Sequence, residues 1–149
     1  MKFNPGYGNA VRLLVTVISV AMVAYHIWAI VLGTPEAVWF RGTHLLFVML
    51  LLFLLHRSSG NVEGTPTPLD WVLLVLAIAP IVYLFVNYDY VVNRIFYVDE
   101  LTTTDMVMGT IMTVMVLEAT RRVIGLALPI TAVVFLLYGL FIAKLDPMR

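Results

Sequence analysis

Long apolar runs separated by short polar loops constrain this chain more than any other feature of its sequence. A helix needs about 20 mostly apolar residues to cross about 30 Å of hydrocarbon at about 1.5 Å per residue. Three runs have about that length, at 11–32, 38–55 and 69–86. Hydrophobic residues make up 62% of the chain and charged residues 12%, a composition that water could not keep dispersed. The sequence therefore predicts an all-α integral membrane protein.

The apolar region from 105 to 143 is too long to be one membrane helix, because it would measure roughly 58 Å. Gly125 and Pro129 are the residues able to break it, so we expect helices at 105–124 and 129–144. The uninterrupted apolar part of the first, 106–117, is also short enough to lie along the membrane interface or to re-enter. The expected fold is a single membrane domain, a small bundle of four to five transmembrane helices. The polar stretch between 87 and 105 predicts an interfacial loop with a short helix.

The orientation is predicted from Lys and Arg residues, which favour cytoplasmic loops. With the N-terminus inside and five spans, the cytoplasmic side holds Lys2, Arg12, Arg57, Arg121 and Arg122. The outer side holds Arg41, Arg94, Lys144 and Arg149. The same small excess results with four spans, so the N-terminus is expected to be cytoplasmic while the span count stays open.

Several classes of function are disfavoured by composition. The formal net charge is zero, so no long-range field attracts nucleic acid, and none is expected as a partner. The chain has no cysteine, which excludes a thiolate metal site or a cysteine nucleophile. Phosphate-binding loops, HExxH and GxSxG motifs are absent from the sequence. We therefore expect no enzyme activity, no catalytic or metal-binding residues and no cofactor.

Two histidines are candidate polar sites within the apolar runs. His26 and His44 are expected at similar depth on adjacent antiparallel helices, so haem ligation by both imidazoles is geometrically open. The interpretation we favour gives them a structural role, bonded to backbone carbonyls or placed in the headgroup zone beside Trp28 and Trp39.

The densest charge cluster beside an apolar run is Glu118, Arg121 and Arg122. On a helix the acid faces the two bases at i+3 and i+4, which lets the cluster neutralise itself in part. Remaining arginine donors could bind lipid phosphates or a partner subunit, and both alternatives stay open. Asp70 and Asp105 each precede an apolar run, and we interpret them as structural helix N-caps.

Several segments resemble one transporter family. The stretch LEATRRVIGLALPITAVVFLLYG (117–139) resembles the small-permease region of tripartite ATP-independent periplasmic (TRAP) transporters, TAXI branch. HLLFVMLLLFLLHR from His44, PLDW at 68–71 and YDYVVNRIFYVDELTTTD at 88–105 are similar to the same region in the same order. The resemblance covers about 12–144.

The resemblance implies a non-catalytic small subunit in the cytoplasmic (inner) membrane of a bacterium or archaeon. Its expected partners are membrane lipids, a large elevator-type permease subunit of about a dozen spans, and a periplasmic TAXI-type binding protein that delivers organic acids. Uptake in that family is driven by a sodium or proton gradient. This region is commonly fused to the large one, so the chain is either a separate subunit or a fragment of a fused permease.

Two other functions remain open at this stage. A haem-bearing membrane anchor of a respiratory enzyme would also be a small apolar bundle. The small subunit of a tripartite tricarboxylate transporter would have a similar size and number of spans.

Overall fold

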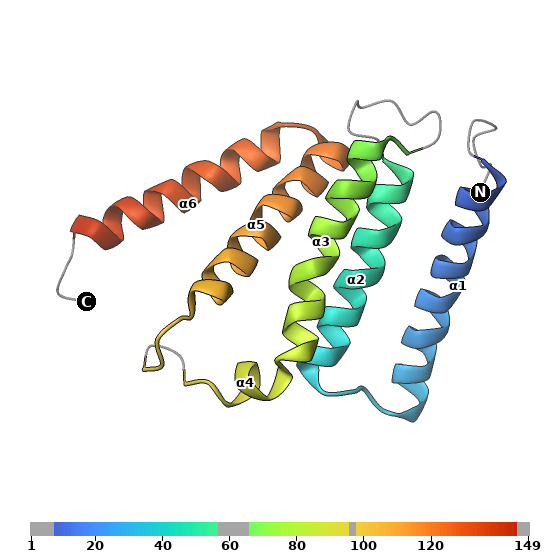
Figure 1. Cartoon of the computed structure of the whole chain (residues 1–149), viewed down its shortest axis with the longest axis horizontal. Helices are drawn as coiled ribbons and strands as arrows, with labels where there is room; N and C mark the ends of the chain where they lie inside the picture. Colours follow the sequence, from blue (N-terminus) through green and yellow to red (C-terminus); the bar gives the residue numbers. More distant parts are fainter. Residues whose placement is uncertain (1–7, 57–65, 96–97, 146–149) are drawn as a thin grey trace.

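The computed structural model describes residues 8–56, 66–95 and 98–145 (Figure 1). Their helices are α1 (Asn9–Leu32), α2 (Ala37–Leu55), α3 (Pro68–Val86), α4 (Tyr88–Asn93), α5 (Thr103–Ile124) and α6 (Ala127–Leu145). No strand occurs in these residues. The all-α prediction is confirmed for the part of the chain that the structure describes.

Three helices are long and apolar enough to cross a membrane. These are α1, α2 and α3, each of at least 19 residues, a pattern typical of a multi-pass membrane protein. Each of the five long helices begins and ends within two residues of its predicted range. The short α4 lies in the loop where the sequence indicated a short helix. Membrane crossing by α5 and α6 stays a prediction.

Helices α1, α2, α3 and α5 stand side by side with alternating directions (Figure 1). α2 packs against α1 and α3, and α3 packs against α5. The buried hydrophobic core comprises Val11, Val15, Met49, Phe53, Leu54, Leu74, Ala77, Ile81, Met115 and Ala119. Most of these residues lie toward the end of the bundle where α2 and α5 finish and α3 begins. We call this the Arg122 end, and the opposite end the Asp105 end.

Helix α6 diverges from the bundle (Figure 1). Among the described helices it contacts α5, and its large apolar side chains from Leu128 to Ile142 are exposed. The turn before it uses Gly125, whose φ of 95° favours glycine and whose N–H donates to the carbonyl of Arg121. Pro129 lies inside the first turn of α6, two residues after the helix begins. Gly125 and Pro129, the two predicted helix breakers, therefore lie at the junction between α5 and α6.

Two threonines cap the helices whose first turns contain the conspicuous aspartates. Thr67 caps α3 and Thr102 caps α5, and Asp70 and Asp105 each occupy the third helical position of a capping box. The interpretation of the aspartates as the N-cap residues is wrong by three positions. In a capping box both residues accept backbone N–H groups, and the one before the helix is the threonine, while the aspartate lies in the first turn.

Close packing fixes α2 against α3 near the Asp105 end. A Cβ atom on Gly42 would lie 2.6 Å from Cε1 of Phe85. The Phe85 ring in turn stacks on Trp39, with ring centroids 4.5 Å apart. Because Trp39 stacks on the Phe85 ring, the ring cannot easily move away from position 42. α2 can therefore approach α3 this closely only with glycine at that position.

Candidate functional site

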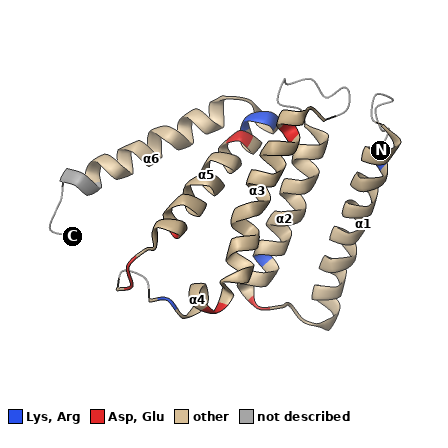
Figure 2. Cartoon of the chain, in the orientation of Figure 1, with Lys and Arg blue, Asp and Glu red and all other residues tan. Residues whose placement is uncertain are grey.

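Lys, Arg, Asp and Glu residues of the described helices lie toward the two ends of the bundle (Figure 2). At the Arg122 end they form a connected group that we call the Arg122 cluster. Its members are His56, Thr67, Asp70, Glu118, Arg121 and Arg122. The cluster joins α3 and α5 to the residue that follows α2.

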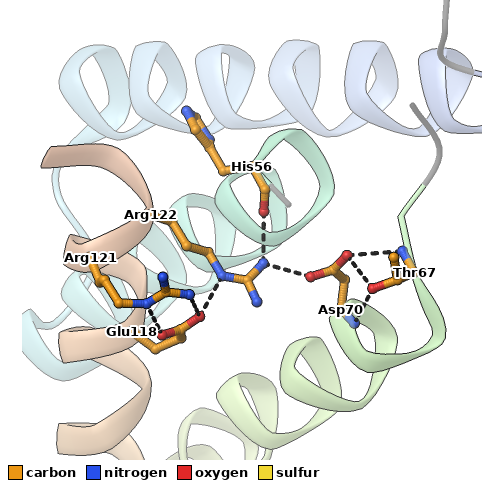
Figure 3. Close-up of polar contacts among 6 residues, drawn as sticks. All are labelled: His56, Thr67, Asp70, Glu118, Arg121 and Arg122. Atoms are coloured by element: carbon orange, nitrogen blue, oxygen red, sulfur yellow. Dashed lines mark hydrogen bonds and ion pairs between the residues drawn. The ribbon is translucent and has the colours of Figure 1, made fainter. Parts of the chain in front are cut away.

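The guanidinium of Arg122 lies at the centre of this cluster (Figure 3). Its Nη1 donates to Oδ1 of Asp70 at 2.9 Å and to the carbonyl oxygen of His56 at 2.7 Å. Its Nε donates to Oε1 of Glu118 at 2.9 Å. The guanidinium carbon also lies 4.6 Å from the centroid of the Phe53 ring, a cation–π distance. Arg122 therefore holds the ends of three helices together.

The Arg122–Asp70 ion pair is fully buried, with both side chains 0% exposed. Asp70 is held from its other side, where its Oδ2 accepts from the hydroxyl of Thr67 at 2.7 Å and from the backbone N–H of Thr67 at 2.9 Å. A buried ion pair stabilises a fold when further hydrogen bonds satisfy its remaining atoms. The capping box supplies those bonds for the carboxylate, so one aspartate both starts α3 and binds the arginine of α5.

Arg121 and Glu118 form the outer part of the cluster. Nε and Nη2 of Arg121 donate to the two carboxylate oxygens of Glu118 at 2.7 and 2.8 Å, a bidentate pair. The Arg121 side chain is 35% exposed and that of Glu118 is 19% exposed. The structure thus places the three charges differently: Arg122 is internal, while Arg121 and part of Glu118 reach the surface. Among the three residues of the predicted lipid or partner interface, Arg121 and Glu118 are the ones with exposed side-chain surface in this structure.

His26 and His44 are brought together, as their expected depth implied. Their rings lie 5.1 Å apart between centroids, with Nε2 of His26 3.0 Å from Nδ1 of His44. Nδ1 of His26 lies 2.6 Å from the carbonyl oxygen of Met22 and so carries the proton. In the neutral imidazole Nε2 of His26 then accepts a hydrogen bond from Nδ1 of His44. In this arrangement these two nitrogens bond to each other and are not directed at an iron, which favours the structural interpretation of the pair.

A second polar group surrounds Asp105 at the opposite end of the bundle. The hydroxyls of Tyr83 and Tyr90 donate to its two carboxylate oxygens, both at 2.7 Å. The backbone N–H and hydroxyl of Thr102 donate to Oδ2 as well, at 3.0 and 2.7 Å. Bonding to the carboxylate, together with desolvation, raises the pKa of the Tyr90 phenol above its ordinary value. The group joins α3, α4 and α5 as the Arg122 cluster joins the other end.

Sequence reasoning found the local pairs of the Arg122 cluster and missed its long-range contact. Asp70 and Arg122 are 52 positions apart, so no helical spacing relates them. A signal was nevertheless present. In the predicted antiparallel topology the start of the third span and the end of the fourth lie on the same side of the bundle. Asp70 is at the first of these positions, and the second has two arginines for one glutamate, so an ion pair between the two spans could have been expected.

Comparison with protein-family models, with curated proteins and with solved structures finds no match for this chain. Across the described residues no group of three or more His, Cys, Asp or Glu side chains is arranged to hold a metal ion.

Proposed function

We propose that this chain is the small, non-catalytic membrane subunit of a TRAP-type secondary transporter, TAXI branch. In this role it supports a large permease subunit that takes up organic acids delivered by a periplasmic binding protein. The proposal depends on the segment resemblance, and one structural observation supports it. The charged residues of LEATRR, the most specific segment, form the cluster that fixes three helix ends to one another, which is the property required of a rigid support.

The polar groups of the described bundle support a structural role rather than a carrier role. Asp70, Asp105 and Arg122 are bonded to neighbouring helices, whereas a carrier needs polar groups directed at a substrate. The threonines of α5 are also satisfied within the helix, since Thr110, Thr113 and Thr120 each donate to the carbonyl four residues earlier. These bonds lower the cost of placing α5 in lipid and support the proposal that it is the fourth span.

The N-terminus is proposed to be cytoplasmic, which places the Arg122 end on the cytoplasmic side. There the exposed part of Arg121 lies where anionic lipid headgroups and cytoplasmic loops of a partner are available. We propose the large permease subunit as the partner of this residue.

The test uses the chain together with a large permease subunit and a TAXI-type binding protein encoded beside it. In liposomes the three proteins should give gradient-driven uptake, and the small chain alone should give none. Uptake by the small chain alone would refute the supporting role. Failure to co-purify with the large subunit would refute the partnership.

Arg121→Lys then tests the contact, because lysine keeps the charge and removes the bidentate fork. The variant should lower the yield of the large subunit in co-purification, with Arg41→Lys at an exposed position of α2 as the matched control. Equal yields from both variants would show that Arg121 contacts lipid only.

A further inference from the structure

A groove opens in the half of the bundle toward the Asp105 end. Its volume is about 340 Å³, within the range of about 300–1,000 Å³ typical of small-ligand sites. Its lining includes Leu45 of α2, Met108 and Met112 of α5, and Pro80, Ile81 and Leu84 of α3. The groove exists partly because α5 carries Gly109 on this face. A Cβ atom there would have nothing within 4 Å.

The polar atoms along the groove are already bonded to one another. The hydroxyls of Tyr83 and Tyr90 donate to Asp105, which also accepts from Thr102. A polar ligand would find these atoms occupied, whereas an apolar chain would replace no hydrogen bond. The lining therefore selects a hydrocarbon occupant.

Arg94 is the exception at the mouth of the groove. Its Nε is buried and has no hydrogen-bond partner within the described ranges. Its Nη2 makes one long contact, 3.4 Å, with the carbonyl oxygen of Asp99. A guanidinium with such unused donors, next to an apolar groove and at the end of membrane-spanning helices, matches the phosphate and tail of a phospholipid.

The length of the groove argues for a lipid tail over a helix from a partner. From Asp105 to Met112 it follows α5 for about 10 Å, less than the roughly 15 Å of one leaflet's hydrocarbon. Beyond that point the core closes it, since Met115 on α5 and Met49 on α2 are buried. A partner helix would need a groove along the whole bundle, whereas a tail can enter from the surface and stop.

The charges around the mouth indicate the type of headgroup. Acidic residues at this end outnumber the two arginines, Arg41 and Arg94 (Figure 2). The acidic residues are Glu36, Asp89, Asp99, Glu100 and Asp105. A headgroup with net negative charge would be repelled here, but one that carries an ammonium beside its phosphate would satisfy both signs.

We propose that this groove holds one acyl chain of a zwitterionic phospholipid whose phosphodiester binds Arg94. The site requires only that the helices lie in a bilayer, so it does not rest on the proposed transporter function.

The test is native mass spectrometry of the full chain, purified in mild detergent from a membrane that contains phosphatidylethanolamine and phosphatidylglycerol. The parent chain should retain one phosphatidylethanolamine. Gly109→Phe fills the groove and should abolish retention, while Gly139→Phe, at an equally open helical glycine on α6, should leave it unchanged. Arg94→Gln should weaken retention about tenfold, because a charge-assisted hydrogen bond to the phosphate is lost.

Leu101→Trp narrows the exposed mouth of the groove and provides a second blocking variant if Gly109→Phe fails to fold. Retention unaffected by both blocking variants would overturn the site. If the chain retained phosphatidylglycerol in preference to phosphatidylethanolamine, or retained a molecule without phosphate, the proposed headgroup contact would be overturned. Copurification of a protein that the blocking variants displace would show a partner helix in place of the lipid.

Discussion

Replacing Arg122 with methionine tests the role of the Arg122 cluster most directly. The substitution keeps an unbranched apolar side chain of similar length over Phe53 and removes the guanidinium. Asp70, a fully buried carboxylate, would keep its bonds to Thr67 and lose the guanidinium of Arg122, and the carbonyl oxygen of His56 would lose a donor. Glu118 would keep its bidentate pair with Arg121. The damage is therefore concentrated at Asp70.

Removing one partner of a buried ion pair costs about 3–5 kcal/mol, since it leaves an uncompensated charge. We expect Arg122→Met to lower the free energy of unfolding by that amount. Arg121→Met is the matched control, the same exchange one position earlier on the same helix. Its side chain is 35% exposed, so its ion pair is screened and the loss should stay within about 1 kcal/mol.

A second substitution separates charge from packing. Asp70→Asn in the Arg122→Met background removes the carboxylate charge that has lost its arginine, while leaving an oxygen to accept from Thr67. It should recover roughly 0.5–3 kcal/mol of the loss. Both effects are measured by reversible unfolding in mixed micelles, with helix content read by circular dichroism. Equal losses for the two arginine variants, or no recovery in the double variant, would refute the role assigned to the buried pair.

Three further predictions concern other parts of the chain. In intact cells an impermeant thiol reagent should label Asp99→Cys and not Ser59→Cys, a position outside the described residues; the opposite pattern would reverse the proposed orientation. Gly42→Ala should destabilise the protein by about 1–3 kcal/mol in the same unfolding assay, because its Cβ would meet the stacked ring of Phe85. Gly139→Ala, in open space, should be neutral or stabilising by up to about 1 kcal/mol. The absorbance spectrum of the purified protein should contain no Soret band; a band that His44→Ala removes would contradict the hydrogen-bonded histidine pair.

The helices could be predicted from the sequence because their causes are local. Apolar runs of membrane length, and a glycine followed by a proline, each act within a few residues. The turn at Gly125 is an example, because one residue with positive φ ends α5 wherever the rest of the chain lies. For the same reason the bounds of the five long helices lie within two residues of the predicted ranges, whereas the short α4 had no predicted bounds.

The candidate site was predicted only as far as local spacing extends. Glu118 was paired with both arginines correctly. The distribution of exposure between Arg121 and Arg122 depends on which face of α5 meets α3, and that depends on packing across the whole bundle. The divergence of α6 has no local cause either, since its apolar residues surround the helix and favour no single side.

The burial of Asp70 against Arg122 also has a consequence during synthesis of the protein, because the two residues are made at different times. A ribosome adds about 5–20 residues per second, so the 52 positions between the two residues correspond to about 3–10 s. During that interval α2 and α3 are complete, while the guanidinium that binds Asp70 in the finished chain has not been made. Arrival of the last turn of α5 adds this ion pair together with the bond from Arg122 to the carbonyl oxygen of His56. A chain released before residue 122 would therefore lack the contact that joins three helix ends, however well its first three helices had formed.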